Sequence, residues 1–284
     1  MKFKITLLLT FCFSVTMIAN VSRAEKEALL QLHQKTNGKQ WTKKWDLNKP
    51  VSSWFGVVLQ DDKVVAIQLA DNNLKGTIPA ALAALKNLQD LDLHKNQIEG
   101  TIPNAIGELK DLRNLNLSFN KLTGAIPSSL CSLSQLKSLE LYMNGLIGDI
   151  PSKIGELQQL EVLSLFNNEL TGEIPSSLYE IKSLKTLLLN SNQLIGALSK
   201  NIAQMNALEN LSLFDNKMEG RIPVELENLS KLKEMNISYN KFNGAVSKSL
   251  ALLDTLNMTM INEKGATVIL KMMAARNTAL ASED

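Results

Sequence analysis

The chain has 284 residues, with 30 basic and 28 acidic side chains and two cysteines, Cys12 and Cys131. A charge this close to balance, with no basic stripe, argues against nucleic acid as the main partner. Cys12 lies in an N-terminal apolar run that we expect to be removed. Cys131 then has no internal disulfide partner, so the stability of the chain must come from its core.

Residues 1–24 predict a cleaved secretory signal peptide. Lys2 and Lys4 form a basic start, residues 5–18 are mostly apolar, and Ser22-Arg23-Ala24 places small residues at the two positions that a signal peptidase reads. An uncleaved membrane anchor is the alternative, disfavoured because the run is short for a span. Cleavage after Ala24 would leave 27 basic against 28 acidic residues, a net charge of -1. The destination would be the periplasm, the cell surface or the medium.

Residues 25–63 predict an N-terminal cap made of a helix and a β-hairpin. Residues 25–37 are amphipathic, and Asn37-Gly38 would end the helix. The stretch "SWFGVVLQDDKVVAIQL" predicts two strands joined at Asp61-Asp62. Three tryptophans could form a sugar platform, but packing over the end of the core is the preferred interpretation. They are Trp41, Trp45 and Trp54.

Residues 64–255 form eight units of equal length with no insertion. Each unit opens on a leucine-like residue, from Val64, Leu88 and Leu112 through to Leu232, and places a glycine and an asparagine at fixed positions. Apolar residues end in an alternating stretch, such as Leu163 and Leu165, which predicts one short strand per unit. Equal spacing would stack these strands in parallel, one per turn of a solenoid.

The asparagine column is expected to be structural. Its side chains carry both donor and acceptor groups, which can satisfy backbone groups where the chain turns out of each strand. The column consists of Asn72, Asn96, Asn120, Asn144, Asn168, Asn192, Asn216 and Asn240.

The pattern LxxLxLxxNxLxGxIPxxLxxLxx, which is 24 residues long, resembles the plant-type leucine-rich repeat of 24 residues. The resemblance implies an α/β solenoid, a right-handed superhelix of eight full repeats plus caps, with a parallel β-sheet on its concave face. The segment at Trp54, Gly56 and Val57 is also similar to the N-terminal cap motif Cys-x-Trp-x-Gly-Val-x-Cys of such proteins. Ser52 and Leu59 occupy the two cysteine positions, so this cap is cysteine-free.

Residues 256–284 predict a degenerate repeat and a C-terminal cap. Leu256 and Ile261 fit a ninth unit, but Lys264 stands where asparagine is expected. The apolar stretch "ATVILKMMAA" is too short to span a bilayer and is interrupted by Lys271. We therefore expect no integral membrane segment in the mature chain, with a surface-lying membrane helix as the alternative.

The variable positions of the expected concave sheet are the candidate ligand site. Large apolar and aromatic residues recur there at unit spacing, which is typical of a binding surface. These residues, together with one histidine, are the candidate ligand contacts: His94, Phe119, Tyr142, Met143, Phe166, Leu188, Phe214 and Tyr239. Polar residues of both charge signs flank them and favour a mixed polar ligand, namely Arg113, Lys137, Glu140, Glu161 and Lys185.

We predict an exported recognition module, not an enzyme, that binds a protein or peptide through the concave sheet and needs no cofactor. A glycan-binding or glycosidase-inhibiting protein is the alternative, by resemblance to plant polygalacturonase-inhibiting proteins, although the missing cap cysteines weigh against it. An enzyme using Asp90, Asp92 and His94 as a metal or acid-base cluster is a third hypothesis. It is disfavoured because a solvated strand face explains these residues and a metal needs more ligands.

Overall fold

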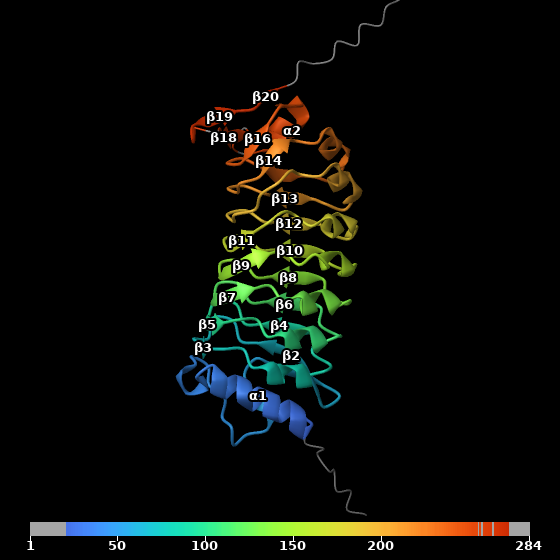
Figure 1. Cartoon of the computed structure of the whole chain (residues 1–284). Helices are drawn as coiled ribbons and strands as arrows, with labels where there is room; N and C mark the ends of the chain where they lie inside the picture. Colours follow the sequence, from blue (N-terminus) through green and yellow to red (C-terminus); the bar gives the residue numbers. More distant parts are fainter. Residues whose placement is uncertain (1–20, 255, 257, 263, 273–284) are drawn as a thin grey trace, which may run out of the picture.

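The structure, a computed structural model, describes residues 21–272 except 255, 257 and 263. Figure 1 shows similar turns stacked from α1 (Arg23–Lys35) at one end to α2 (Lys248–Leu253) at the other. Residues 1–20, which hold most of the predicted signal peptide, lie outside the described residues.

One face of the stack is a nine-stranded sheet. Its order is β1 (Val57–Gln60), β2 (Lys63–Gln68), β4 (Asp90–Asp92), β6 (Asn114–Asn116), β8 (Ser138–Glu140), β10 (Val162–Ser164), β12 (Thr186–Leu188), β13 (Asn210–Ser212) and β15 (Glu234–Asn236). All neighbours are parallel except β1 and β2. Leu163 pairs with Leu139 and Leu187, one repeat away on either side. The predicted solenoid with a parallel sheet is confirmed.

A second parallel sheet follows the asparagine column, and the sequence did not indicate it. It contains β3 (Lys75–Gly76), β5 (Gln97–Gly100), β7 (Lys121–Ala125), β9 (Gly145–Asp149) and β11 (Glu169–Thr171), and β14 (Glu219–Arg221) pairs separately with β16 (Lys241–Asn243). Between them the ladder continues as single bonds, such as Gln193 N–H to the Leu170 carbonyl at 2.8 Å. These strands are two to five residues long, too short to show an alternating pattern.

The outer wall consists of short 3₁₀ segments that begin after the proline column. They are η3 (Ala80–Ala84), η4 (Asn104–Glu108), η5 (Ser128–Ser132), η6 (Ile154–Glu156), η7 (Ser176–Glu180), η8 (Lys200–Gln204) and η9 (Val224–Asn228). Each contributes a buried apolar residue, such as Leu178, to one continuous core. The inward leucines of the sheet complete that core, so the concave face is held rigid from behind.

The N-terminal cap buries its aromatic residues. Trp41, Trp45 and Trp54 are at most 5% exposed and contact one another in sequence order. They therefore pack over the end of the core, and the sugar platform considered above is not formed. Short 3₁₀ turns, η1 (Gly38–Gln40) and η2 (Val51–Ser53), connect α1 to the β1–β2 hairpin. Asp61 and Asp62 both adopt positive φ in the hairpin turn.

The C-terminal cap is made of short strands. β17 (Ala245–Val246) pairs with β20 (Lys271–Met272), and β18 (Thr259–Ile261) forms a hairpin with β19 (Thr267–Ile269). The surface-lying membrane helix considered for this stretch is wrong as far as Met272, because the backbone there is extended; residues 273–275 lie outside the described part. Within the described residues, none of the helices has the length and apolar character needed to cross a bilayer.

Candidate functional site

Three columns of side chains form the candidate concave surface. The first lies between the inward leucines of each strand, the second directly follows the strand's second inward leucine, and the third comes next. Third-column residues adopt the left-handed conformation, with φ of +52° at Phe119 and +58° at Tyr239. The chain therefore turns sharply at this column, which the alternating pattern alone did not indicate.

The aromatic residues of the second and third columns gather in two clusters. In the first cluster, Tyr142 stacks on Phe166 with ring centroids 4.3 Å apart, and Phe119 meets Tyr142 edge-on at 5.3 Å. In the second, Phe214 and Tyr239 meet edge-on at 5.2 Å. The stripe expected from the sequence is thus interrupted in the sixth repeat.

In the sixth repeat, an amide and an aliphatic side chain replace the aromatic residues. Asn190 occupies the second column there, between Phe166 and Phe214, and Leu188 occupies the first. Leu188 is in register with Ser164 and Ser212 on the neighbouring strands, and it is half-buried. The predicted contact Leu188 therefore lies between the two aromatic clusters and belongs to neither.

Met143 lies away from the sheet, along the edge where the chain turns. With Phe119 and Asn167 it lines a groove of about 560 Å³ that extends toward the N-terminal cap. Lys95 and Asp71 also line this groove and form an exposed ion pair at 3.1 Å. Phe119 is 42% exposed and contacts Tyr142, so it connects this groove to the first aromatic cluster.

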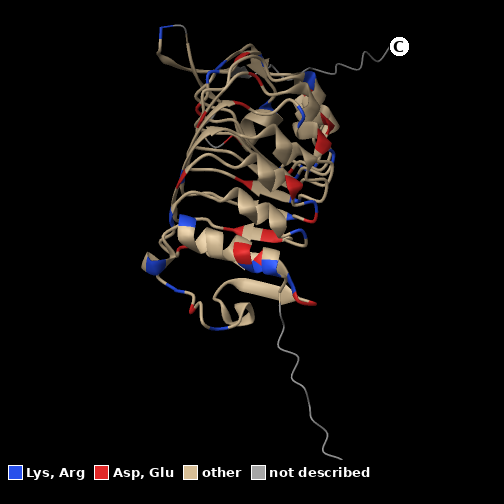
Figure 2. Cartoon of the chain, turned by 60° about the horizontal axis from the view of Figure 1, so that its bottom comes forward, with Lys and Arg blue, Asp and Glu red and all other residues tan. Residues whose placement is uncertain are grey.

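Two of the five predicted flanking charges, Lys185 and Glu161, neutralise each other. Lys185 bonds Glu161 at 2.6 Å, and Lys233 bonds Glu209 at 2.5 Å, in consecutive repeats. The hydrogen bond from Lys185 holds the pKa of the Glu161 carboxyl below its usual value, and the same bond raises the pKa of Lys185. These exposed pairs contribute little stability, but they leave the edge without a single charge sign. Figure 2 shows acidic and basic residues scattered along the stack.

The other flanking residues are placed differently. Arg113 and Lys137 are exposed at the N-terminal side of this charged edge; Lys137 is next to Glu161, and Arg113 lies one repeat further away. Glu140 is on the sheet itself, where it accepts a hydrogen bond from the Ser138 hydroxyl at 3.0 Å. The flanking set predicted from the sequence is therefore not one cluster.

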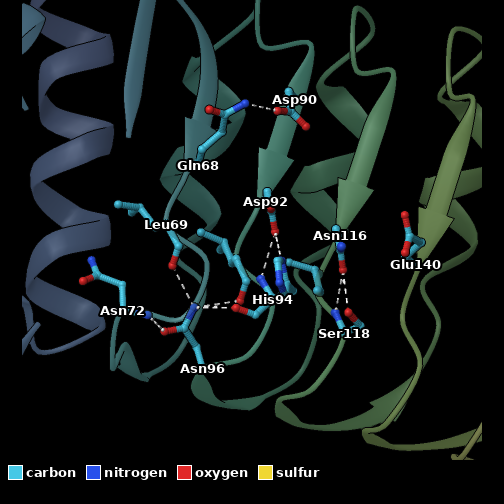
Figure 3. Close-up of polar contacts among 12 residues, drawn as sticks. Gln68, Leu69, Asn72, Asp90, Asp92, His94, Asn96, Asn116, Ser118 and Glu140 are labelled. Carbon is cyan, nitrogen blue, oxygen red and sulfur yellow. Dashed lines mark hydrogen bonds and ion pairs between the residues drawn. The ribbon is translucent and has the colours of Figure 1, made fainter. Parts of the chain in front are cut away.

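His94 lies at the N-terminal end of the surface (Figure 3). Its Nδ1 is 2.7 Å from the Asp92 carboxylate, whereas Asp90 accepts a hydrogen bond from Gln68 at 2.8 Å. The structure thus brings Asp92 and His94 together but engages Asp90 elsewhere. Among the described residues there is no group of three His, Cys, Asp or Glu side chains able to hold a metal ion.

The asparagine column lies beneath this surface and satisfies the backbone. Asn96 shows the recurring arrangement: its Oδ1 accepts from the Leu74 N–H, and its Nδ2 donates to the carbonyls of Leu69 and Leu93, each at 2.9 Å. Figure 3 shows its bond to the Leu69 carbonyl. From Asn96 onward each such residue links two successive turns, which fixes the spacing of the concave columns, whereas Asn72 bonds the backbone of Lys43 in the cap.

Comparison with known proteins identifies the type of repeat. The family described as a leucine-rich repeat region matches residues 112–269, and a second leucine rich repeat family matches residues 62–122. Among curated proteins, no sequence matches the chain.

Several solved structures are similar. One is the PEPR1–AtPEP1 complex, 30% identical with a TM-score of 0.73, where the match covers 81% of this chain and 37% of that one. The plant peptide hormone receptor RGFR1 with RGF2 is 29% identical with a TM-score of 0.63, covering 70% and 35%. The Arabidopsis receptor kinase HAESA with the peptide hormone IDA and the co-receptor SERK1 is 28% identical with a TM-score of 0.53, covering 79% and 47%. The match spans less than half the length of each.

Proposed function

The chain belongs to the leucine-rich repeat family, and we propose that it is an exported recognition module that binds a protein or peptide through its concave sheet. The observation that carries the proposal is the pair of aromatic clusters on a rigid, core-backed sheet. Tyr239 and Phe119 are 37% and 42% exposed, although a soluble fold buries most large aromatics. Clustered exposed aromatics on a preformed surface are typical of binding sites.

The similar structures support the proposed class of partner. The structure of RGFR1 contains RGF2, and that of HAESA contains a peptide hormone and a co-receptor. The present chain shares the repeat architecture with only part of each receptor. The proposal that this chain also binds a peptide or protein therefore rests on its exposed aromatic clusters, and mutation of these clusters tests it.

The basic and apolar N-terminal segment supports export. We propose cleavage after Ala24, and a destination in the periplasm, on the cell surface or in the medium. The proposed module has no catalytic step; Asp90, the third member of the acid-base cluster considered from the sequence, bonds Gln68 and not the Asp92–His94 pair.

The test is the simultaneous replacement of Tyr142, Phe166 and Phe214 by alanine. The mature protein, immobilised and incubated with extract of its native source, should capture a protein or peptide by cross-linking, and the triple variant should lose it. The matched control is Phe55→Ala, because Phe55 is 40% exposed but lies on the N-terminal cap. Circular dichroism of all three proteins should be the same.

Capture that survives in the triple variant would reject the concave site. The glycan alternative has its own outcome in the same design: an oligosaccharide array bound by the wild type and not by the triple variant, with no captured polypeptide, would replace the peptide proposal. Inhibition of a pectin-degrading enzyme, lost in the triple variant, would identify the glycosidase-inhibiting form of that alternative.

A further inference from the structure

Several asparagines of the chain begin an Asn-x-Ser/Thr triplet, the acceptor motif for N-linked oligosaccharides on exported proteins. The chain after the proposed cleavage site contains five such triplets, which begin at Asn116, Asn210, Asn228, Asn236 and Asn257. Asn257 lies outside the described residues. The other four differ in how the fold presents the asparagine amide and the hydroxyl two residues later, the two groups that define the motif.

Two of the four triplets have a serine that the fold conceals. Ser118 and Ser238, which follow Asn116 and Asn236, are both 0% exposed. The Ser118 hydroxyl donates to Asn116 Oδ1 at 2.7 Å, and the Ser238 hydroxyl donates to the Asp254 carboxylate at 2.9 Å. Both asparagines also end strands of the large sheet, β6 and β15. A carbohydrate at either position would therefore stand on the candidate concave site.

The third triplet lies within the same sheet. Asn210 and Ser212 are half-buried on β13, whose backbone pairs with β12 on one side and with β15 on the other. To enter the active site of a transferase, this triplet would have to leave both ladders, which requires local unfolding of the sheet. The folded chain therefore does not present it.

The Asn228 triplet lies on the outer wall, where Asn228 ends η9. Asn228 and Ser230 are both exposed, whereas Leu229 between them is 5% exposed and belongs to the core. The nearby backbone bonds are local, from the Leu229 N–H to the Leu226 carbonyl at 3.3 Å and from the Ser230 N–H to the Asn228 carbonyl at 2.9 Å. Among the four triplets in the described part of the chain, this is the one that the folded surface displays.

The wall beside Asn228 exposes apolar side chains that an attached sugar would cover. Val224, at the start of η9, is 56% exposed, and Leu252, which holds the position of Asn228 in the next repeat, is 77% exposed. In repeat five, the same two positions hold Ser176 and Glu180. Exposed apolar groups on a soluble protein favour association unless something covers them. A hydrated oligosaccharide anchored between them would do so and, being on the outer wall, would leave the concave site free.

We propose that Asn228 is the acceptor of an N-linked oligosaccharide. A transferase supplies the sugar from a polyprenyl diphosphate carrier. The Asn228 Nδ2 attacks the anomeric carbon, a carbon–nitrogen bond forms, and the carbon–oxygen bond to the diphosphate breaks. The amide loses one proton to a base of the transferase, the carrier diphosphate leaves, and no group is oxidised or reduced. Glu227 and Lys231 flank the triplet, one of each sign, and an uncharged sugar conflicts with neither.

Peptide mapping by mass spectrometry of the protein purified from its native source tests the proposal. The peptide that contains Asn228 should carry the mass of an oligosaccharide, and peptide N-glycosidase should remove that mass and leave aspartate at this position. The peptides that contain Asn116, Asn210 and Asn236 should be unmodified. An Asn228 peptide found only in its unmodified form would overturn the proposal, and carbohydrate on any of the three sheet asparagines would overturn the argument from exposure.

Variants expressed in the same source show whether the triplet itself is recognised. Asn228→Gln and Ser230→Ala should each lose the carbohydrate completely, although Ser230→Ala keeps the amide. Ser230→Thr keeps a hydroxyl at the position that the motif requires and should retain the carbohydrate. The matched control is Asn206→Gln, because Asn206 is exposed on the same wall but begins no triplet; its carbohydrate should equal that of the wild type. Carbohydrate that persists in Ser230→Ala would mean that the triplet is not the acceptor.

This inference rests on the proposed export of the chain, and the outcomes distinguish the two. A chain that keeps residues 1–24 and stays inside the cell would overturn both. A cleaved, exported chain with an unmodified Asn228 would overturn the inference alone. Capture of the ligand by Asn228→Gln should match that of the wild type, because the outer wall and the concave sheet lie on opposite sides of the core.

Discussion

Tyr142 and Phe166 stack with ring centroids 4.3 Å apart and planes 12° from parallel, although they belong to consecutive repeats and are far apart in the sequence. The contact follows from the register, because parallel pairing of β8 and β10 places equivalent positions of consecutive repeats side by side. Phe166 and Phe214 occupy the same column but are separated by Asn190. Aromatic side chains on this surface therefore contact one another only when they belong to adjacent repeats.

A double-mutant cycle should detect this relationship. Replacing Tyr142 and Phe166 by leucine, singly and together, should give a coupling of about 0.5–1.5 kcal/mol in the free energy of unfolding, the range for aromatic pairs. The cycle for Phe166 and Phe214 is the control and should give a coupling close to zero. Urea denaturation measures both, and equal couplings would contradict the two-cluster arrangement.

Asn168 should contribute far more to stability than its neighbour Asn167. Its side chain accepts from the Leu146 N–H at 3.1 Å and donates to the carbonyls of Leu141 and Leu165 at 3.1 and 2.9 Å. Asn168→Ala should therefore lose about 2–4 kcal/mol of unfolding free energy. Asn167→Gly is the control, because glycine tolerates the φ of +54° found there and the loss should stay below about 1 kcal/mol. Similar losses in the two variants would count against the structural column.

The repeat pattern predicted the stacked strands and the inward leucines because each unit independently reports the same positions. Leu163 and Asn168 could be assigned in this way before any contact was known. The turn at Phe119 and the second sheet could not, since neither produces an apolar period of its own. The separation of Phe166 from Phe214 depends on which residue the intervening repeat carries, and its consequence appears only once the register is known.

Alkaline pH should destabilise the protein partly through Cys131. Burial raises the pKa of this thiol to about 11, above its unfolded value. The folded state therefore favours the protonated thiol; this contribution is complete below the unfolded pKa and is lost as pH rises through about 11. Cys131→Ala should therefore lose less stability than the wild type as the pH rises from 9 to 11, as measured by urea denaturation. Alanine fits, because Ala83 and Ala203 occupy the same repeat position.

Tyr179 is the internal comparison for this pH dependence. Burial raises the pKa of its hydroxyl to about 12, so its contribution is lost at higher pH than that of Cys131 by the same reasoning. The Cys131→Ala variant should therefore still unfold more easily near pH 12. A pH profile identical to that of the wild type would show that the Cys131 thiol does not participate.

The position of the proposed signal-peptide cleavage should affect stability measurably. The Ser22 hydroxyl accepts from the Glu25 N–H at 3.2 Å and donates to its carboxylate at 2.7 Å, while Glu25 also accepts from the Val64 N–H at 3.1 Å. Cleavage after Ala24 would remove this cap and place an α-amino group at the positive end of the α1 dipole. A chain starting at Glu25 should be about 1–2 kcal/mol less stable than one starting at Val21. The mass of the protein isolated from its native source identifies the natural start, and equal stability of the two forms would show that the cap contributes nothing.

Asp254 should be essential for closing the C-terminal end of the large sheet. Its carboxylate is 3% exposed and accepts from the Ile237 N–H at 2.8 Å, and from the Ser238 hydroxyl and the Leu256 N–H at 2.9 Å. Asp254→Ala would leave these donors unpaired and should cost about 2–4 kcal/mol. The exposed Asp215→Asn is the control, because asparagine tolerates the φ of +56° found there, and it should change stability by less than about 0.5 kcal/mol. Because each repeat is held by its neighbours, faster hydrogen exchange should begin at Ile237. Normal exchange there in Asp254→Ala would mean that another group closes this edge.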